Sequence, residues 1–288
     1  MINNTEIKGG QRTKGILKHG TNEKPLISII TVVLNGEKYL EKTILSISKQ
    51  TYKNVEHIII DGGSSDRTLD IIRKYEDLID IWISEKDKGL YNAMNKGIAL
   101  SNGDFIGFVG SDDYLYHNTL EKLAHASKQR EIDYTVGPVD ILSKNGQLLE
   151  KINVLSNFLF KNRFIFDMAT HHLSFYVNRN MINRVGGFDE TFSTRSDYDM
   201  TINIMSLSKR FYYFNESVGA FRLGGVSGTY KSYLENFYIL RKHKISMIKS
   251  ILNILPSLFK LFIINNFPKS FINFLRKNFS SGRFEKYN

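Results

Sequence analysis

Cysteine is absent from this chain of 288 residues, and tryptophan occurs only once. Without thiols the chain can form neither a disulfide framework nor a thiolate metal site, so catalysis and metal binding must use oxygen and nitrogen groups. Long apolar runs are also missing. No stretch reaches about 18 consecutive apolar residues, which argues against a conventional membrane span. The first 20 residues lack the apolar segment and small-residue cleavage site of a secretory signal.

The formal net charge of +10 is unevenly distributed along the chain. Residues 1–24 carry +3, residues 25–228 carry −2 and residues 229–288 carry +9. A nearly neutral body with basic ends indicates that the ends, rather than the body, meet an anionic partner. We therefore expect a flexible basic arm (1–24), a folded central domain (25–228) and a basic tail (229–288).

Short apolar runs alternate with amphipathic segments in the first half of the central domain. The runs predict strands, because they are β-branched and bounded by glycine, asparagine or aspartate. Strands are predicted over 26–34, 55–60, 79–83 and 105–109, and helices over 37–50, over 66–75 and within 84–100. This order predicts an α/β fold in which helices flank a mostly parallel sheet. No G-x-G-x-x-G follows the first strand, which argues against a nicotinamide-binding domain.

The stretch DFIGFVGSDD, residues 104–113, combines a buried strand with two adjacent carboxylates at its exit. In open α/β sheets ligands bind at the carboxyl edge of the strands, where Asp112 and Asp113 would lie with Leu34 and Asp61. Two carboxylates there suit a hard divalent cation that holds a phosphate-bearing substrate. The alternative is an ordinary solvated Asp-Asp turn.

Six segments carry a resemblance to a known family. They are TVVLNGEKYL, IIIDGGSSDRT, ISEKDKGLYNAMNKGIA, GDFIGFVGSDD, HHLSFYVNRNMINRVGGFDETFSTRSDYD and FRLGGVSGT. In this order the segments resemble the inverting family 2 glycosyltransferases of GT-A fold, and most closely the bacterial subgroup that builds O-antigen, colanic-acid and exopolysaccharide repeat units. The resemblance covers roughly residues 26–229. It implies a Rossmann-like GT-A domain over 25–228 followed by an amphipathic helical tail.

The resemblance implies a UDP-sugar donor and a set of residues that bind it. Asp61 corresponds to the aspartate that contacts uracil, although a turn or cap role is the alternative. The other donor-side candidates are Thr31 and Glu37 near the nucleoside, Asn92, Asn95 and Lys96 on one helix face near the pyrophosphate and sugar, and Arg222 near the diphosphate. Relatives commonly have Asp where this chain has Asn92, and capping could also explain that residue.

The Ser-Asp-Asp of the strand exit resembles the D-x-D-type metal motif of these enzymes. The resemblance makes Asp113 the direct ligand of Mn²⁺ or Mg²⁺, with Asp112 reaching the metal or the sugar. Gly110 stands where some relatives have Asp or Asn. A bound metal would bridge the diphosphate and neutralise the leaving group.

Asp197, in RSDYD, corresponds to the catalytic base, which takes the proton of the acceptor hydroxyl in a single inverting displacement. Capping of the following helix is the alternative for Asp197, and Asp199 is expected to be structural. On the acceptor side the candidates are His171, His172 and Asp189. An isolated histidine is more often a packed or hydrogen-bonded core residue.

The tail from Lys244 onward mixes Ile, Leu and Phe with spaced basic residues, and prolines divide it into short helical pieces. This pattern is typical of a helix lying on an anionic membrane surface. The basic residues expected to meet lipid are Lys249, Lys260, Lys269, Arg276 and Lys277. Packing on the central domain, or a homodimer contact, is the alternative role of this tail.

The resulting hypothesis is a metal-dependent enzyme, peripheral at the cytoplasmic face of the cell membrane. It would transfer one hexose, of the glucose or galactose type, to a lipid-diphosphate-linked sugar. Processive members carry Q-x-x-R-W, which this chain lacks, so a single transfer is expected. The alternatives are a non-catalytic nucleotide-sugar-binding scaffold and a nucleic-acid-binding protein. The second is disfavoured, because the basic charge follows an Ile-rich amphipathic tail rather than an aromatic stacking platform.

Overall fold

The computed structural model describes residues 7–152, 171–224 and 229–266. The chain divides into two compact units, Met1–Arg222 and Leu223–Asn288. Some expectations lie outside the described residues: the first six residues of the arm, the boundary at 228/229, and the end of the tail with Lys269, Arg276 and Lys277.

The first unit is built on an eight-stranded sheet of order β1-β4-β3-β2-β5-β10-β7-β11. Its four central strands, β4, β3, β2 and β5, are mutually parallel. These four are Ile81–Ser84, Val55–Asp61, Ile27–Val33 and Phe105–Phe108, which confirms the strands predicted from the apolar runs. The sheet therefore has the mostly parallel core that the alternation of strands and helices predicts.

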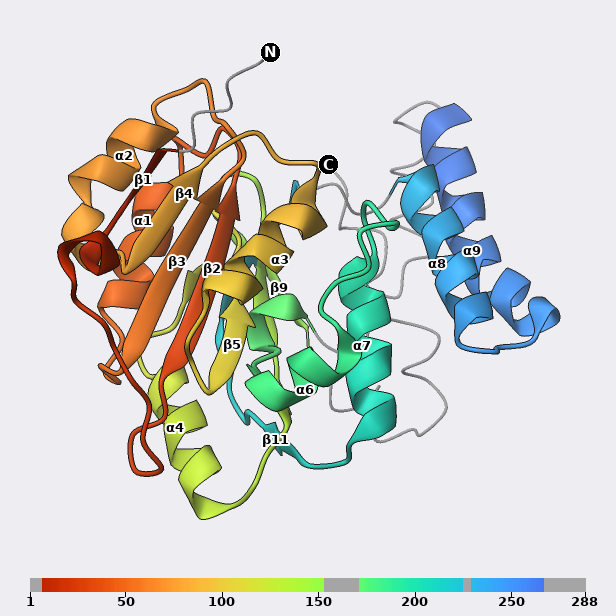
Figure 1. Cartoon of the computed structure of the whole chain (residues 1–288). Coiled ribbons are helices and arrows are strands. Elements are labelled where there is room, and N and C mark those ends of the chain that lie inside the picture. Colours follow the sequence, from red (N-terminus) through yellow and green to blue (C-terminus); the bar gives the residue numbers. More distant parts are fainter. Residues whose placement is uncertain (1–6, 153–170, 225–228, 267–288) are drawn as a thin grey trace, which may run out of the picture. The chain divides into compact units, whose positions relative to one another are not determined.

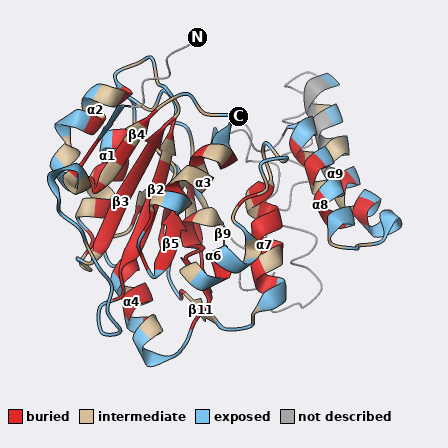
Figure 2. Cartoon of the chain, in the orientation of Figure 1, coloured by how far each residue is buried: buried red, intermediate tan, exposed pale blue. Residues whose placement is uncertain are grey.

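Helices cover both faces of this parallel core (Figure 1). In β2, β3 and β5 even-numbered residues such as Ile30 and Ile58 pack with α3, α6 and α7, whereas odd-numbered residues such as Ile29 and Ile59 pack toward α1, α2 and α4. Because both faces are covered, the strands are mostly apolar and are buried, and their few polar residues are buried with them (Figure 2). The helices are α1 (Leu40–Ser48), α2 (Thr68–Lys74), α3 (Leu90–Leu100), α4 (Thr119–Gln129), α6 (Arg179–Val185) and α7 (Ser196–Leu207).

Short strands extend the sheet and form a second one. β10 (Val177–Asn178) runs antiparallel to both β5 and β7 (Tyr134–Val136), and β11 (Phe211–Tyr213) is parallel to β7. A four-stranded sheet has the order β6-β12-β8-β9. Its members are Tyr114–Leu115, Gly219–Arg222, Val139–Leu142 and Leu148–Ile152. The sequence did not predict these strands, but β6 and β12 determine the geometry of the site described below.

The N-terminal segment is not a flexible arm over its described length, so that expectation is wrong for residues 7–18. β1 (Ile7–Gly9) pairs antiparallel with β4, and η1 (Gln11–Lys14), a 3₁₀ helix, follows it. The Arg12 guanidinium forms an ion pair with Glu56, which lies inside β3 and is fully buried. Lys18 pairs with the buried Asp80 at 2.8 Å. Arg12 and Lys18 thus neutralise buried carboxylates within and next to the sheet.

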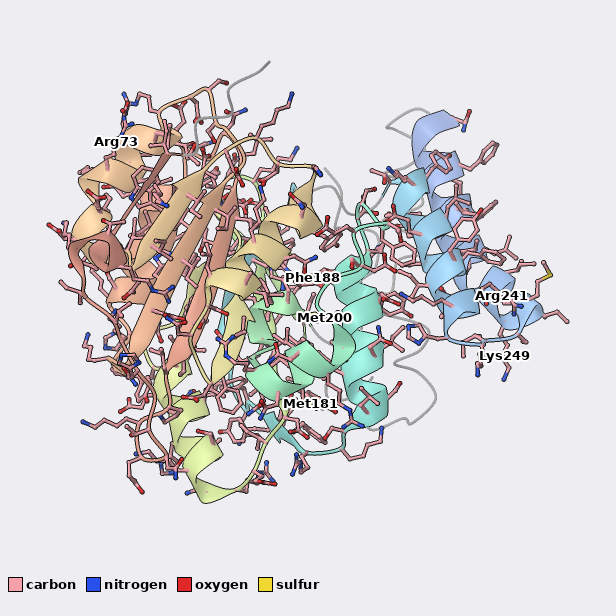
Figure 3. The ribbon with its side chains drawn as sticks, in the orientation of Figure 1. Arg73, Met181, Phe188, Met200, Arg241 and Lys249 are labelled. Atoms are coloured by element: carbon pink, nitrogen blue, oxygen red, sulfur yellow. The ribbon has the colours of Figure 1, made fainter. Side chains whose placement is uncertain are left out.

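The described part of the second unit is a helical hairpin of α8 (Tyr230–Lys242) and α9 (Met247–Asn266). Arg241 and Lys249 lie near the turn that joins the two helices (Figure 3). Several large apolar side chains of α9 are exposed and recur at helical spacing: Ile248, Ile251, Leu252, Leu255, Phe259 and Phe262. No helix among the described residues is long and apolar enough to cross a membrane.

Candidate active site

The exit of β5 is shaped by a threonine on α1. The hydroxyl of Thr43, which is fully buried, donates to the backbone carbonyls of Ser111 and Asp113 at 3.0 and 2.6 Å. The backbone N–H of Asp113 in turn donates to the carbonyl of Gly110, which closes a tight turn. These bonds hold the two carboxylates at the carboxyl edge of the sheet, where the strand pattern predicts them.

Gly110 makes room for both carboxylates. A Cβ at this position would lie 2.7 Å from Oδ2 of Asp113 and 3.4 Å from Oδ1 of Asp112, so the two side chains converge on the space that glycine leaves. Burial and the negative charge of Asp113 raise the pKa of Asp112 to about 6. A nearby cation stabilises the ionised form of such crowded, partly desolvated carboxylates.

Asp113 is buried and is held by two segments from the second half of the chain. Its Oδ1 accepts the backbone N–H of Arg222 at 3.0 Å, and its Oδ2 lies 3.3 Å from Nε2 of His172. The first contact follows from strand pairing, because β6 begins directly after Asp113 and runs antiparallel to β12, which ends at Arg222. The second comes from η3 (His172–Ser174).

His172 links this carboxylate pair to Asp197. Burial lowers the pKa of His172, but the hydrogen bond with Asp113 and the charges of Asp113, Asp197 and Asp112 outweigh burial and raise it. The His172 ring packs on His171 at 4.2 Å between centroids, and His171 packs on Phe221 of β12 at 4.3 Å. Carboxylates from two distant parts of the chain, the Asp112–Asp113 pair and Asp197, therefore act on one imidazole.

Asp197 lies in the first turn of α7 and is partly buried. Its Oδ1 accepts the hydroxyl of Tyr91 at 3.0 Å and the backbone N–H of Tyr198 at 2.9 Å. Asp199, two residues on, is buried and accepts from Asn203 at 3.2 Å. The two carboxylates of this motif thus have different surroundings, and only Asp197 is among the groups that raise the pKa of His172.

The Arg222 side chain is buried beside the aspartate pair. Its guanidinium lies 4.1 Å from the centre of the Tyr39 ring and donates to the backbone carbonyls of Ser143 and Lys144, both at 3.2 Å. The Tyr39 hydroxyl donates to the same Lys144 carbonyl. The Arg222 charge opposes the rise in the pKa of Asp112, so the guanidinium supplies positive charge to this edge of the sheet.

The loops that follow β2 and β3 are joined by hydrogen bonds at the same edge. Asp61, at the end of β3, is fully buried and accepts from the Ser64 hydroxyl and from the Ser84 hydroxyl at 2.6 Å. Glu37 is exposed, and its carboxylate accepts the backbone N–H of Arg67 at 3.1 Å.

Thr31 does not reach this edge. It lies in the middle of β2, is fully buried and pairs with His57 of β3 at 3.0 Å. The expectation that Thr31 borders the nucleoside is therefore wrong, because the residue occurs before the strand ends and its side chain points into a helix-covered face.

The α3 candidates take part in bonds within the protein. Asn92 and Asn95 both donate to Glu190, and Asn95 also exchanges hydrogen bonds with the backbone of Phe188 at 2.9 Å. Phe188 packs inward near Met200 (Figure 3). Lys96 pairs with Glu85 and Asp87 at 2.6 and 2.8 Å. Asn92 and Asn95 thus connect α3 to the turn that precedes α7.

Asp189 belongs to that turn. Its Oδ1 accepts the backbone N–H and the hydroxyl of Thr191, a capping arrangement within the loop. The sequence analysis missed Tyr39, Thr43 and Tyr91. Tyr91 stands within a segment that carried the family resemblance, but only the fold brings it to Asp197.

The residues that could hold a divalent cation are Asp112 and Asp113. Within the described ranges, no group of three or more His, Asp or Glu is placed to hold a metal ion. Two carboxylates nevertheless fit Mg²⁺ or Mn²⁺, because such ions are commonly bound through one or two carboxylates and the phosphates of a substrate. Oδ2 of Asp113 and Oδ1 of Asp112 converge beside Gly110, so these are the two oxygens that a shared ion would contact.

The fold resembles the solved structures of TarS and of a mannosyltransferase. The TarS fragment 1–349 of Staphylococcus aureus has a TM-score of 0.63 at 18% identity, covering 87% of this chain and 78% of that one. TarS has also been solved with UDP-GlcNAc. The mannosyltransferase PcManGT of Pyrobaculum calidifontis, solved with GDP-Man and Mn²⁺, has a TM-score of 0.58 at 13% identity and covers 93% of this chain and 84% of that one. The predicted GT-A fold is thereby confirmed.

Sequence relatives point the same way. A PGL/p-HBAD biosynthesis glycosyltransferase of Mycobacterium tuberculosis is 30% identical over 63% of this chain and 70% of its own length. The putative teichuronic acid biosynthesis glycosyltransferase TuaG of Bacillus subtilis is 26% identical over 70% of this chain and 81% of its own. The model of glycosyl transferase family 2 matches residues 28–192, more than half of the chain. This match shows that the chain belongs to glycosyl transferase family 2.

Proposed function

We propose that this protein transfers one hexose from a UDP-sugar, of the glucose or galactose type, to a sugar carried on a lipid diphosphate. The transfer inverts the anomeric carbon and serves the synthesis of a bacterial surface polysaccharide such as an O-antigen, colanic acid or exopolysaccharide. The names of two similar proteins, which mention teichuronic acid biosynthesis and UDP-GlcNAc, support this class of reaction. The lack of Q-x-x-R-W supports a single transfer over polymerisation.

One observation carries the proposal: Asp197 bonds to Tyr91, whose ring packs through Phe188 on Phe108 of β5, the strand that leads to the aspartate pair. The aspartate pair follows β5, whereas Asp197 begins α7, so only the fold brings them together. A site for sugar transfer needs both a group that holds the diphosphate and a base near the anomeric carbon. This arrangement has a candidate for each.

We assign the donor to the carboxyl edge of the sheet. Asp61, at the end of β3, and Glu37, in the loop after β2, face the nucleoside in this proposal, and Arg222 and Lys96 lie on the diphosphate side. Asn92 and Asn95 act on the donor side by holding the turn at Phe188 and Glu190. A Mn²⁺ or Mg²⁺ ion on Asp112 and Asp113, when bound, neutralises the charge of the departing UDP.

The chemical step is a single displacement. Asp197 removes the proton from the acceptor hydroxyl while that oxygen forms a bond to the anomeric carbon. The bond from this carbon to the UDP oxygen breaks on the opposite face, and UDP departs with the electron pair. His171, His172 and Asp189 border the acceptor in this scheme.

The α8–α9 hairpin is proposed to hold the enzyme on the cytoplasmic face of the cell membrane. The exposed apolar residues of α9 share one helix face, and Lys249 beside that face is also exposed. Residues 229–288 carry +9 in total, which complements anionic lipid. A homodimer contact through the same face is the alternative that a vesicle experiment distinguishes.

The experiment that tests the proposed reaction is a turnover assay on the full chain. UDP-glucose, UDP-galactose and UDP-N-acetylglucosamine are each offered with a synthetic lipid-diphosphate GlcNAc or GalNAc acceptor, in Mn²⁺ and in chelator. We expect acceptor-dependent UDP release that needs the metal, and a product with inverted anomeric configuration. A retained configuration contradicts the single displacement, and UDP-sugar binding without release of UDP under any condition indicates a non-catalytic scaffold.

A further inference from the structure

Tyr91 on α3 contacts the proposed base across 106 residues of sequence. Its hydroxyl donates to Oδ1 of Asp197 at 3.0 Å, and its ring is almost completely buried. The ring packs on Phe188 at 5.3 Å between centroids, and Phe188 packs on Phe108 of β5 at 5.0 Å. Because the ring is fixed by this cluster, the hydroxyl has one position, directly against the carboxylate.

We propose that Tyr91 is a positioning residue for Asp197: it holds Oδ1 and leaves Oδ2 to take the proton of the acceptor hydroxyl. This inference rests on the proposed function, in which Asp197 is the base. The backbone N–H of Tyr198 donates to the same Oδ1, so both donors hold one oxygen and orient the other.

The surroundings of Asp197 keep the Tyr91 hydroxyl in its donor form. The charged and titratable groups near it are Tyr91 on α3, Arg195 just before α7, and His172 in η3. Burial and the charge of Asp197 raise the pKa of Tyr91, so the phenol stays protonated and remains a donor at any working pH. A hydrogen bond from a neutral donor favours the ionised carboxylate, and its loss shifts the carboxylate toward the protonated form.

The direct test is Tyr91→Phe, which removes the hydroxyl and keeps the ring that packs on Phe188. UDP release is followed against pH, with whichever of UDP-glucose, UDP-galactose and UDP-N-acetylglucosamine turns over fastest. We expect the acid limb of kcat to move up by about one pH unit and kcat to fall about tenfold, with the donor KM within about twofold of wild type. An unchanged pH profile and kcat in the folded variant would overturn the proposal.

A matched control is Tyr176→Phe. Tyr176 is also a fully buried tyrosine, but its ring lies against Gly107 of β5, and it is not near Asp197 among the contacts of the described residues. Removing the Tyr176 hydroxyl should leave the pH dependence of kcat unchanged. A 3-fluorotyrosine at position 91, which keeps the hydroxyl and donates more strongly, should move the acid limb to lower pH. An unmoved limb in the fluorinated protein also overturns the proposal.

A double-variant cycle separates this inference from the proposed function. If Tyr91 acts through Asp197, then Tyr91→Phe should cause no further loss of kcat in an Asp197→Asn background. If kcat of the double variant falls by the product of the two single losses, Tyr91 acts elsewhere, while Asp197 remains the base. Wild-type turnover in Asp197→Asn alone removes the base, and the role of Tyr91 with it.

Discussion

The ion pair between Arg12 and Glu56 makes a quantitative prediction about the N-terminal segment. Glu56 lies inside β3, its side chain is 1% exposed, and that of Arg12 is 11% exposed. Removing one partner of a buried pair leaves an uncompensated charge and costs about 3–5 kcal/mol. Glu56 keeps the Ser28 hydroxyl and the backbone N–H groups of residues 102 and 103 as donors, so we expect the lower figure for Arg12→Ala, about 3 kcal/mol.

The chain provides both the control and the probe for this experiment. Lys14, in the same 3₁₀ helix, pairs with Asp77 on the surface, where the two side chains are 49% and 84% exposed. Lys14→Ala removes an equal charge from the same helix and should leave stability unchanged, because water solvates both partners. Trp82 is the single tryptophan, is buried in β4 and lies opposite Gly9 of β1, so its fluorescence reports on this edge of the sheet.

In urea unfolding followed by Trp82 fluorescence, Arg12→Ala should lower the midpoint by about 1 M or more. This shift is the loss of about 3 kcal/mol divided by an m-value of about 2–3 kcal/mol/M. Lys14→Ala should superimpose on wild type. Equal midpoints for the two variants would refute the reasoning, because the N-terminal segment would then add only surface charge.

Three further predictions concern the site, the core and the tail. Gly110→Ala should cut turnover about tenfold or more without unfolding the chain, because the new Cβ would lie 2.7 Å from Asp113 Oδ2; wild-type kinetics would contradict this. Burial lowers the pKa of His57 to about 3, so its neutral form stabilises the fold above pH about 6.5, and this contribution is lost as pH falls toward 3 at about 1.4 kcal/mol per pH unit. In His57→Gln the free energy of unfolding should therefore fall less steeply as pH decreases, by about 1.4 kcal/mol per pH unit. Equal slopes for the variant and wild type would contradict the low pKa of His57. Leu252→Asp with Phe259→Asp should abolish sedimentation with anionic phosphatidylglycerol vesicles, whereas retained sedimentation would show that this face of α9 does not bind the lipid.

Much of the central sheet could be predicted because its strands are covered on both faces. Such strands are largely apolar in sequence, and 26–34 and 55–60 match β2 and β3 to within one residue at each end. The exit of β5 could be predicted for the same reason, since an apolar run that stops at Gly110 places Asp112 and Asp113 at the edge.

The second half of the fold could not be predicted in this way. β6, β10 and β12 have two to four residues each, too few for a periodic pattern, and they are recognised only by their pairing. The contact between Asp113 and the backbone of Arg222 depends on that pairing. A backbone donor leaves no trace in the choice of side chains.

Charge was the least reliable guide. Arg12 lies in a basic segment that its charge predicts to be a solvated arm. Its partner Glu56 nevertheless lies within a mostly apolar strand, 44 residues away. Tyr91 was likewise indistinguishable from an ordinary core aromatic until the fold placed its hydroxyl on Asp197. Long-range pairs of this kind follow from tertiary structure, which local spacing does not contain.

The measurement that tests the central claim most directly compares Asp113→Asn with Asp197→Asn for both UDP binding and turnover in Mn²⁺. The account predicts that Asp113→Asn loses the metal-dependent part of UDP binding together with turnover. It also predicts that Asp197→Asn binds UDP within a few-fold of wild type and loses about 10² or more in kcat, the scale of a missing general base. Wild-type turnover in Asp197→Asn, or metal-enhanced UDP binding that persists in Asp113→Asn, would contradict the assignment of these carboxylates to the base and to the metal.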